Sequence, residues 1–218
     1  MIILGLMFMI IPLSVRAAEE PRYEVSLKFY KVPQSMQDSQ NIAADWFNSE
    51  YMYNWENEID QNSIVNPGDY IIVAPVIKLI GGKEANAKTF SLYIDYDNLV
   101  FEKVDIYINN SQEDFYKQPF PEVTNGWDIS VTCDKYMRFY VSDFGYEENI
   151  VYDNGMDYPI AFVALKVNDT VSLGNLYSFH FYYKNAQIPS SGSIEDNTIV
   201  ETPLKFNNYY LRIGGGVT

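Results

Sequence analysis

The sequence has 218 residues, which is enough for one large domain with a substantial core. Its 29 Asp and Glu residues outnumber 15 Lys and Arg residues, and the formal net charge of -14 argues against binding to nucleic acid or anionic lipid, because such a field repels phosphate. A single cysteine, Cys133, leaves no partner for an intramolecular disulfide, so the disulfide-stapled class of domain is excluded.

The N-terminal stretch MIILGLMFMIIPLSVRAAEE is an apolar run that ends at Val15 and is followed by small residues. Val15 and Ala17 fit the −3 and −1 positions of a cleavage site, which predicts a secretory signal peptide over residues 1–18, cleaved after Ala17 or Ala18. No Lys or Arg precedes the apolar run, and an uncleaved anchor is the alternative. The mature chain, residues 19–218, is expected to form a single secreted domain without a further membrane span.

The first elements after this leader are strands separated by an insertion. YEVSLKFY, residues 23–30, alternates apolar and polar side chains and predicts a half-buried strand. Residues 33–62 break the alternation and predict a partly helical insertion rich in aromatic residues. The apolar run within residues 66–82 has a turn signal at each end and predicts another strand. Since Pro75 has no N–H, we expect that strand to lie at an edge or bulge and to switch sheets.

The rest of the chain predicts further short strands. In TFSLYIDY, residues 89–96, alternation points Leu92 and Ile94 inward and Tyr93 and Asp95 outward. The later runs, each bounded by Gly, Pro, Asn or Asp, are LVFEKVDIYI, WDISVTC, MRFYVSD, IAFVALKV, LYSFHFYY and LKFNNYYLRI. Short strands without intervening long helices predict an all-β fold, an antiparallel jelly-roll β-sandwich of about nine strands.

Three stretches carry a resemblance to a known family. They are GDYIIVAPV, FSLYIDYDNLVFEKV and MRFYVSDFGYEENIVYDNGMDYPIAFVALKV, which together span most of residues 66–183. Their order and spacing resemble cohesin domains, the modules that receive dockerins in cellulosomes and related bacterial surface assemblies. The resemblance implies a non-catalytic β-sandwich that binds an extracellular protein.

The resemblance also implies where a partner would bind. In the family the partner lies on the sheet built from strands eight, three, six and five, and Tyr140 falls where the family places an apolar anchor. The family's Asn and Asp pair on strand three falls on Thr89 and Ser91, and neither is an acid or an amide. Carried over by position, the partner-binding residues are Thr89, Ser91, Tyr93, Asp95, Arg138, Tyr140 and Ser142.

Catalytic and metal-binding chemistry has little support in the sequence. His180 lies alone in an aromatic strand, and Cys133 has inward parity, which indicates a buried small hydrophobe. A glycosidase needs only two carboxylates, yet the candidates fit turn chemistry and solvated charge better: Asp95, Asp97, Asp143, Glu147 and Glu148. The acidic loop 143–157 could bind calcium, but it lacks the D-x-D-x-D-G spacing. We expect no cofactor and no metal.

Two functions therefore compete. The favoured one is a secreted, non-catalytic module that binds a dockerin-like or other extracellular protein in a cell-surface or polysaccharide-degrading assembly. The alternative is a carbohydrate-binding module that uses aromatic rings of the insertion as a platform for a polysaccharide, and a glycoside hydrolase ranks below both. The platform residues would be Trp46, Tyr51, Tyr53 and Trp55.

Overall fold

A computed structural model describes eleven segments of the chain. They are residues 23–50, 58–60, 63–80, 85–87, 89–107, 127–143, 150–152, 157–159, 161–181, 191–192 and 204–214. The predicted leader, residues 1–18, lies outside them. In these segments, no helix is long and apolar enough to span a bilayer.

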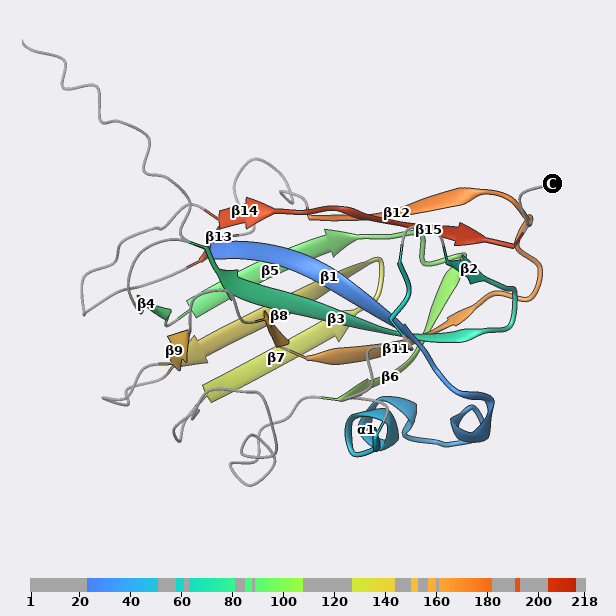
Figure 1. Ribbon diagram of the computed structural model, residues 1–218, viewed down its shortest axis with the longest axis horizontal. Coiled ribbons are helices and arrows are strands. Elements are labelled where there is room, and N and C mark those ends of the chain that lie inside the picture. Colours follow the sequence, from blue (N-terminus) through green and yellow to red (C-terminus); the bar gives the residue numbers. More distant parts are fainter. Residues whose placement is uncertain are drawn as a thin grey trace, which may run out of the picture.

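One layer of the molecule is a six-stranded sheet (Figure 1). Its strands run in the order β14-β1-β3-β11-β6, and β10 also pairs with β3. The bounds are β1 Tyr23–Lys31, β3 Tyr70–Leu79, β6 Phe101–Tyr107, β10 Asp157–Pro159, β11 Phe162–Val167 and β14 Leu204–Phe206. All of these pairs are antiparallel except β1 with β14, which is parallel.

The second layer is a seven-stranded sheet in the order β2-β15-β12-β5-β8-β7, with β13 paired to β5. Its strands are β2 Ile64–Val65, β5 Thr89–Asp95, β7 Trp127–Cys133, β8 Tyr136–Asp143, β12 Leu176–Phe181, β13 Ser191–Gly192 and β15 Tyr209–Ile213. A separate pair joins β4 Ala85–Ala87 to β9 Ile150–Tyr152. The predicted all-β sandwich is confirmed, although the described segments hold fifteen strands, several of them two or three residues long, and two parallel pairs.

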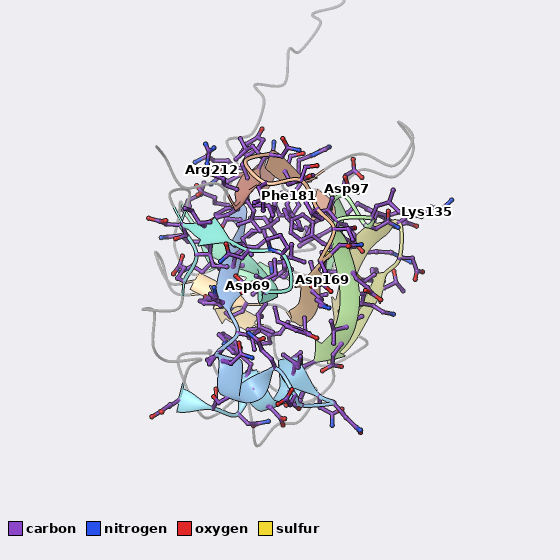
Figure 2. All side chains as sticks on the ribbon, turned by 90° about the vertical axis from the view of Figure 1, so that its right-hand side faces the viewer. Asp69, Asp97, Lys135, Asp169, Phe181 and Arg212 are labelled. Atoms are coloured by element: carbon purple, nitrogen blue, oxygen red, sulfur yellow. The ribbon has the colours of Figure 1, made fainter. Side chains whose placement is uncertain are left out.

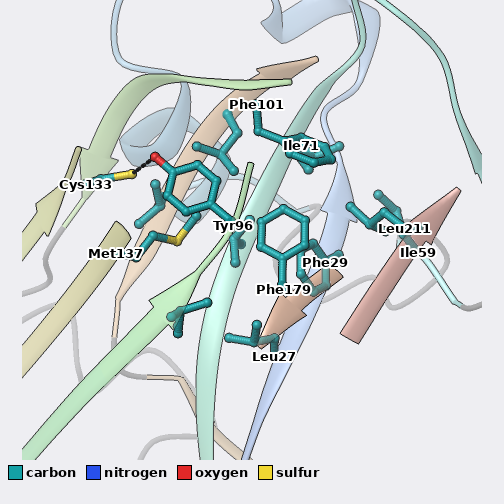
Figure 3. Close-up of a cluster of buried hydrophobic side chains, with 14 of the residues drawn as sticks. Leu27, Phe29, Ile59, Ile71, Tyr96, Phe101, Cys133, Met137, Phe179 and Leu211 are labelled. Carbon is teal, nitrogen blue, oxygen red and sulfur yellow. Dashed lines mark hydrogen bonds between the residues drawn. The ribbon is translucent and has the colours of Figure 1, made fainter. Parts of the chain in front are cut away.

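The main core lies between the two sheets and is built on aromatic rings (Figure 3). The ring of Phe29 meets that of Phe179 edge-on, with centroids 4.8 Å apart, and Phe101 lies 4.8 Å from Phe179 as well. Leu92 and Ile94 are fully buried in this core, so the inward parity predicted for their strand is confirmed. Burying large rings from both layers supplies the hydrophobic contribution that a two-sheet fold needs.

The expectation that Pro75 lies in an edge strand that switches sheets is wrong. Strand β3 is central, because β1 pairs along its whole length while β11 and β10 share its other side. The β11 ladder on β3 covers residues 70–73 and the β10 ladder covers residues 76–78, so Pro75 falls between the two partners. A residue without an N–H is tolerated there because the ladder is interrupted on that side.

The predicted insertion does contain helix, and it covers the outer face of the six-stranded sheet. After the 3-10 turn Gln34–Met36 comes helix α1, Ile42–Phe47, which lies beneath β6 and β11 in Figure 1. Its apolar side chains form a second core with the outward side chains of the sheet: Tyr30, Val32, Ile42, Ala43, Trp46, Phe47, Ile72, Ala74, Phe162 and Ala164. Asp105 Oδ2 on β6 accepts a hydrogen bond from the Ala43 N–H at 3.1 Å, which joins the start of the helix to the sheet.

Candidate partner-binding face

The outward face of strands β5 and β8 carries the residues predicted to bind a partner. The antiparallel register pairs Tyr93 with Arg138 and Asp95 with Tyr136. It also places Ser91 opposite Tyr140 and Thr89 opposite Ser142. All seven predicted positions therefore lie on one ladder, because the two strands pair along their whole length. On the other edge of β8, strand β7 extends the same surface.

Arg138 is held between two aromatic rings on this face. Its guanidinium carbon lies 5.7 Å from the Tyr93 ring centroid and 5.6 Å from the Tyr140 ring centroid. Each contact is a cation–π interaction worth roughly 0.5 to 1 kcal/mol at a partly exposed site. The Nε atom of Arg138 is buried and has no hydrogen-bond partner. The two ring contacts thus order the Arg138 side chain before any partner arrives.

Tyr93 differs from its prediction as an exposed contact residue. It has the expected outward parity, yet only 4% of its surface is exposed. Arg138 covers one part of its ring, and the Tyr136 ring lies 5.7 Å away between centroids. Tyr93 therefore packs beneath Arg138 and is covered by it. Tyr140 and Arg138 are only partly buried and reach the surface.

His180 and Asp95 form a pair at one end of this face. Strand β12 pairs His180 with Asp95, and His180 Nε2 lies 3.4 Å from Asp95 Oδ2. The sequence by itself predicts an isolated histidine at position 180. Nothing in the sequence pairs it with Asp95, because β5 and β12 lie far apart in the chain. Tyr136 was also missed, although its outward parity with Arg138 and Tyr140 could have identified it.

No group of three or more His, Cys, Asp or Glu side chains in the described segments could bind a metal ion. Asp97, one of the glycosidase candidates, accepts a hydrogen bond from the Leu99 N–H at 3.0 Å, which is the turn chemistry expected of it. Most of the proposed calcium loop, including Asp153, lies outside the described residues.

The predicted carbohydrate platform is wrong for Trp46. This side chain is only 1% exposed and packs in the second core, where its ring centroid lies 4.8 Å from that of Tyr30 and 5.5 Å from that of Phe162. The sequence placed it among polar residues, and only the docking of α1 on the sheet buries it. The remaining platform residues, Tyr51, Tyr53 and Trp55, lie outside the described residues.

The arrangement of the two sheets is similar to that of cohesin modules of known structure. The seventh ScaB type I cohesin from Pseudobacteroides cellulosolvens matches with a TM-score of 0.51 and 13% identity, over 71% of this chain and 88% of that chain. A cohesin–dockerin complex of OlpC from Clostridium thermocellum matches with a TM-score of 0.51 and 12% identity, over 91% and 98% of the two chains. The sixth cohesin of scaffoldin B from Acetivibrio cellulolyticus, solved with a Cel5 dockerin, gives 0.51 and 12%, over 88% and 98%.

No protein-family model matches the sequence, and neither does any curated protein. Because the sequence identities are only 12% to 13%, these comparisons establish a likeness in fold alone. This chain has the fold of a cohesin module.

Proposed function

We propose that this protein is a secreted, non-catalytic binding module that receives a dockerin-like protein on the outward face of β5 and β8. The observation that carries the proposal is Arg138, held between Tyr93 and Tyr140 on that face. A preordered arginine beside a partly exposed tyrosine has the composition of an interface hot spot, where Tyr and Arg are enriched. Arg138 is already held between two rings, so less conformational entropy is lost when a partner binds it.

The position of this cluster in the fold supports the same face. The resemblance to cohesins implies that strands β12-β5-β8-β7 correspond to strands eight, three, six and five, the sheet on which that family receives its partners. Thr89 and Ser91 stand at the positions of the family's Asn and Asp pair. We therefore propose a dockerin-like partner that relies less on hydrogen bonds to β5 and more on the Arg138 and Tyr140 side chains than ordinary dockerins do.

Secretion and assembly at a cell surface belong to this proposal as well. The sequence of residues 1–18 supports export by a cleavable leader, and the net charge of -14 favours a solvated extracellular surface over lipid or nucleic acid. N-terminal sequencing of exported protein should find residue 18 or 19 first. Recovery of membrane-bound protein that still begins at Met1 would refute this part.

The partner-binding face is tested by alanine substitution. Residues 19–218 are used as bait in culture supernatant, and each captured protein is then purified and titrated by calorimetry. Tyr140→Ala should weaken its binding by about 2 kcal/mol or more, as central aromatic anchors do. Leu99→Ala is the matched control, because Leu99 is 80% exposed and lies in the turn before β6.

Titration with soluble polysaccharides tests the alternative function, which is carbohydrate binding. We expect no heat of binding, because the proposed face binds a protein and because Trp46, one of the four platform residues, is buried and cannot stack on a sugar. If Tyr140→Ala and Leu99→Ala bind the captured protein equally well, the partner does not use this face. Saturable binding of a polysaccharide that survives in Tyr140→Ala would replace the proposal with a carbohydrate-binding function.

A further inference from the structure

A second group of exposed apolar side chains lies on the seven-stranded sheet, away from the β5 and β8 face. Seven large apolar side chains are exposed in the described segments, and four of them gather around one arginine. We call this group the Arg212 patch, and its members are Ile64, Leu173, Leu176, Tyr210 and Arg212. Isolated exposed apolar residues are ordinary, whereas a cluster of them marks an interaction site.

Strand register brings these side chains together. On β15, Arg212 pairs with Leu176 of β12 on one side and with Ile64 of β2 on the other. Tyr210 lies two residues away on the same outward face, while Leu211 between them is buried. Leu173 lies against Gly214, so closely that any side chain there would collide with it. Apolar side chains therefore surround Arg212. Leu176 and Ile64 come from the two neighbouring strands, Tyr210 from the same strand, and Leu173 from the turn before β12.

Arg212 is an exposed charge that the described fold does not neutralise. Several described lysines pair with carboxylates, among them Lys28 with Glu58, Lys31 with Asp69, Lys166 with Asp169 and Lys205 with Glu24. Arg212 has no such contact with any described carboxylate, although the chain carries 29 acidic residues against 15 basic ones. Figure 2 shows Arg212 at the outer margin of the molecule, on the side opposite helix α1.

We propose that the Arg212 patch is a second docking surface, which binds an amphipathic segment of a protein partner that sets a carboxylate between apolar side chains. The planar guanidinium group can donate two parallel hydrogen bonds to one carboxylate, a geometry that favours arginine over lysine for this recognition. Ile64, Leu176 and Tyr210 supply apolar area on either side of the charge. The surface is independent of the β5 and β8 face, because it is built from β2, β15 and the first half of β12.

A second copy of this chain fits the patch less well. A twofold axis through a patch this small would bring two Arg212 guanidinium groups together, with no carboxylate between them. The net charge of -14 on each copy opposes association as well. A carboxylate-bearing segment of a different protein removes both difficulties, because its local negative charge meets the arginine directly.

The test uses residues 19–218 and a fluorescein-labelled helical peptide with leucines on one face and glutamates beside them. Two peptides of the same length carry glutamine or lysine in place of glutamate. Fluorescence anisotropy at physiological salt should show binding of the glutamate peptide and weaker binding of the other two. Arg212→Gln and Leu176→Ser should each weaken the glutamate peptide at least about tenfold, the usual effect of losing a charged hydrogen bond or a central apolar contact.

Two control variants remove a charge and an apolar group elsewhere. Lys135→Gln, in the turn between β7 and β8, and Leu99→Ser should bind the glutamate peptide like wild type. No binding of that peptide, equal binding of the glutamine peptide, or an equal loss in Lys135→Gln would overturn the proposal. A dimer in sedimentation velocity that disappears in Arg212→Gln would assign the patch to a second copy instead. Binding of the glutamate peptide should be unchanged in Tyr140→Ala, so this experiment tests the Arg212 patch separately from the β5 and β8 face.

Discussion

The hydroxyl oxygen of Tyr96 lies 3.2 Å from the sulfur of Cys133 in the core between the sheets (Figure 3). The same hydroxyl donates to the Asp134 carbonyl at 3.0 Å, so it holds the end of β7 against the end of β5. Burial raises the pKa of the Cys133 thiol, and burial also raises the pKa of Tyr96. Both groups therefore stay protonated across the physiological range.

The Cys133 thiol should be unreactive in the native protein. Only 3% of the residue is exposed, and its raised pKa leaves little thiolate to attack a reagent. With Ellman's reagent at pH 8, we expect slow release of thionitrobenzoate from folded protein and complete release in guanidinium chloride. Since the chain has one cysteine, the signal has a single source. Immediate stoichiometric reaction without denaturant would contradict the buried placement.

Stability should fall between about pH 10 and pH 12 in part because of Tyr209. Burial raises the pKa of this tyrosine to about 12, and its hydroxyl donates to the Ile59 carbonyl. In that interval the unfolded state has lost the proton while the folded state retains it, so the free energy of unfolding decreases as pH rises. Urea midpoints of wild type and Tyr209→Phe, measured from about pH 9 to about pH 12, should show a shallower decrease in the variant. Identical slopes would contradict the raised pKa of Tyr209.

Trp46→Ala should destabilise the fold by about 3 to 5 kcal/mol, the usual cost of emptying a buried aromatic site. The ring contacts Tyr30 and Phe162 and attaches α1 to the six-stranded sheet. Chemical denaturation followed by circular dichroism measures the change, and Trp46→Phe should recover part of it. Leu99→Ala, at an exposed position, should stay within about 0.5 kcal/mol of wild type. Wild-type stability in Trp46→Ala would show that the insertion does not pack on the sheet.

Alanine substitutions at two glycines should distinguish the cost of backbone strain from the cost of a steric collision. Gly68 and Gly174 have φ angles of 82° and 85°, which L-residues rarely adopt. A Cβ at Gly68 would lie 2.8 Å from Asp169 Oδ1, whereas a Cβ at Gly174 has nothing within 4 Å. Gly174→Ala should cost about 1 kcal/mol from the backbone alone, and Gly68→Ala should cost more. Thermal or urea unfolding of the two variants gives the comparison, and an equal loss would show that the Asp169 side chain moves away freely.

The elements of this protein follow from local patterns in the sequence. Alternation in residues 23–30 and 89–96 predicted which side chains face the core, since the side-chain period of a strand is two and needs no partner to be read. The turn at Gly68 and the carboxylate turn at Asp97 were likewise predictable, because both depend on contacts within a few residues. The same parity placed Arg138 and Tyr140 on one outward face.

Which strands become neighbours was decided only by the tertiary structure. Pro75 lies in a central strand because β10 and β11 meet beside it, and those strands come some 80 residues later. Trp46 is buried because α1 docks on outward side chains of the six-stranded sheet, and Arg212 lies among apolar groups because β15 falls between β2 and β12. Local sequence constrains φ, ψ and the side-chain period, whereas pairing over such distances is selected by the burial of the whole core.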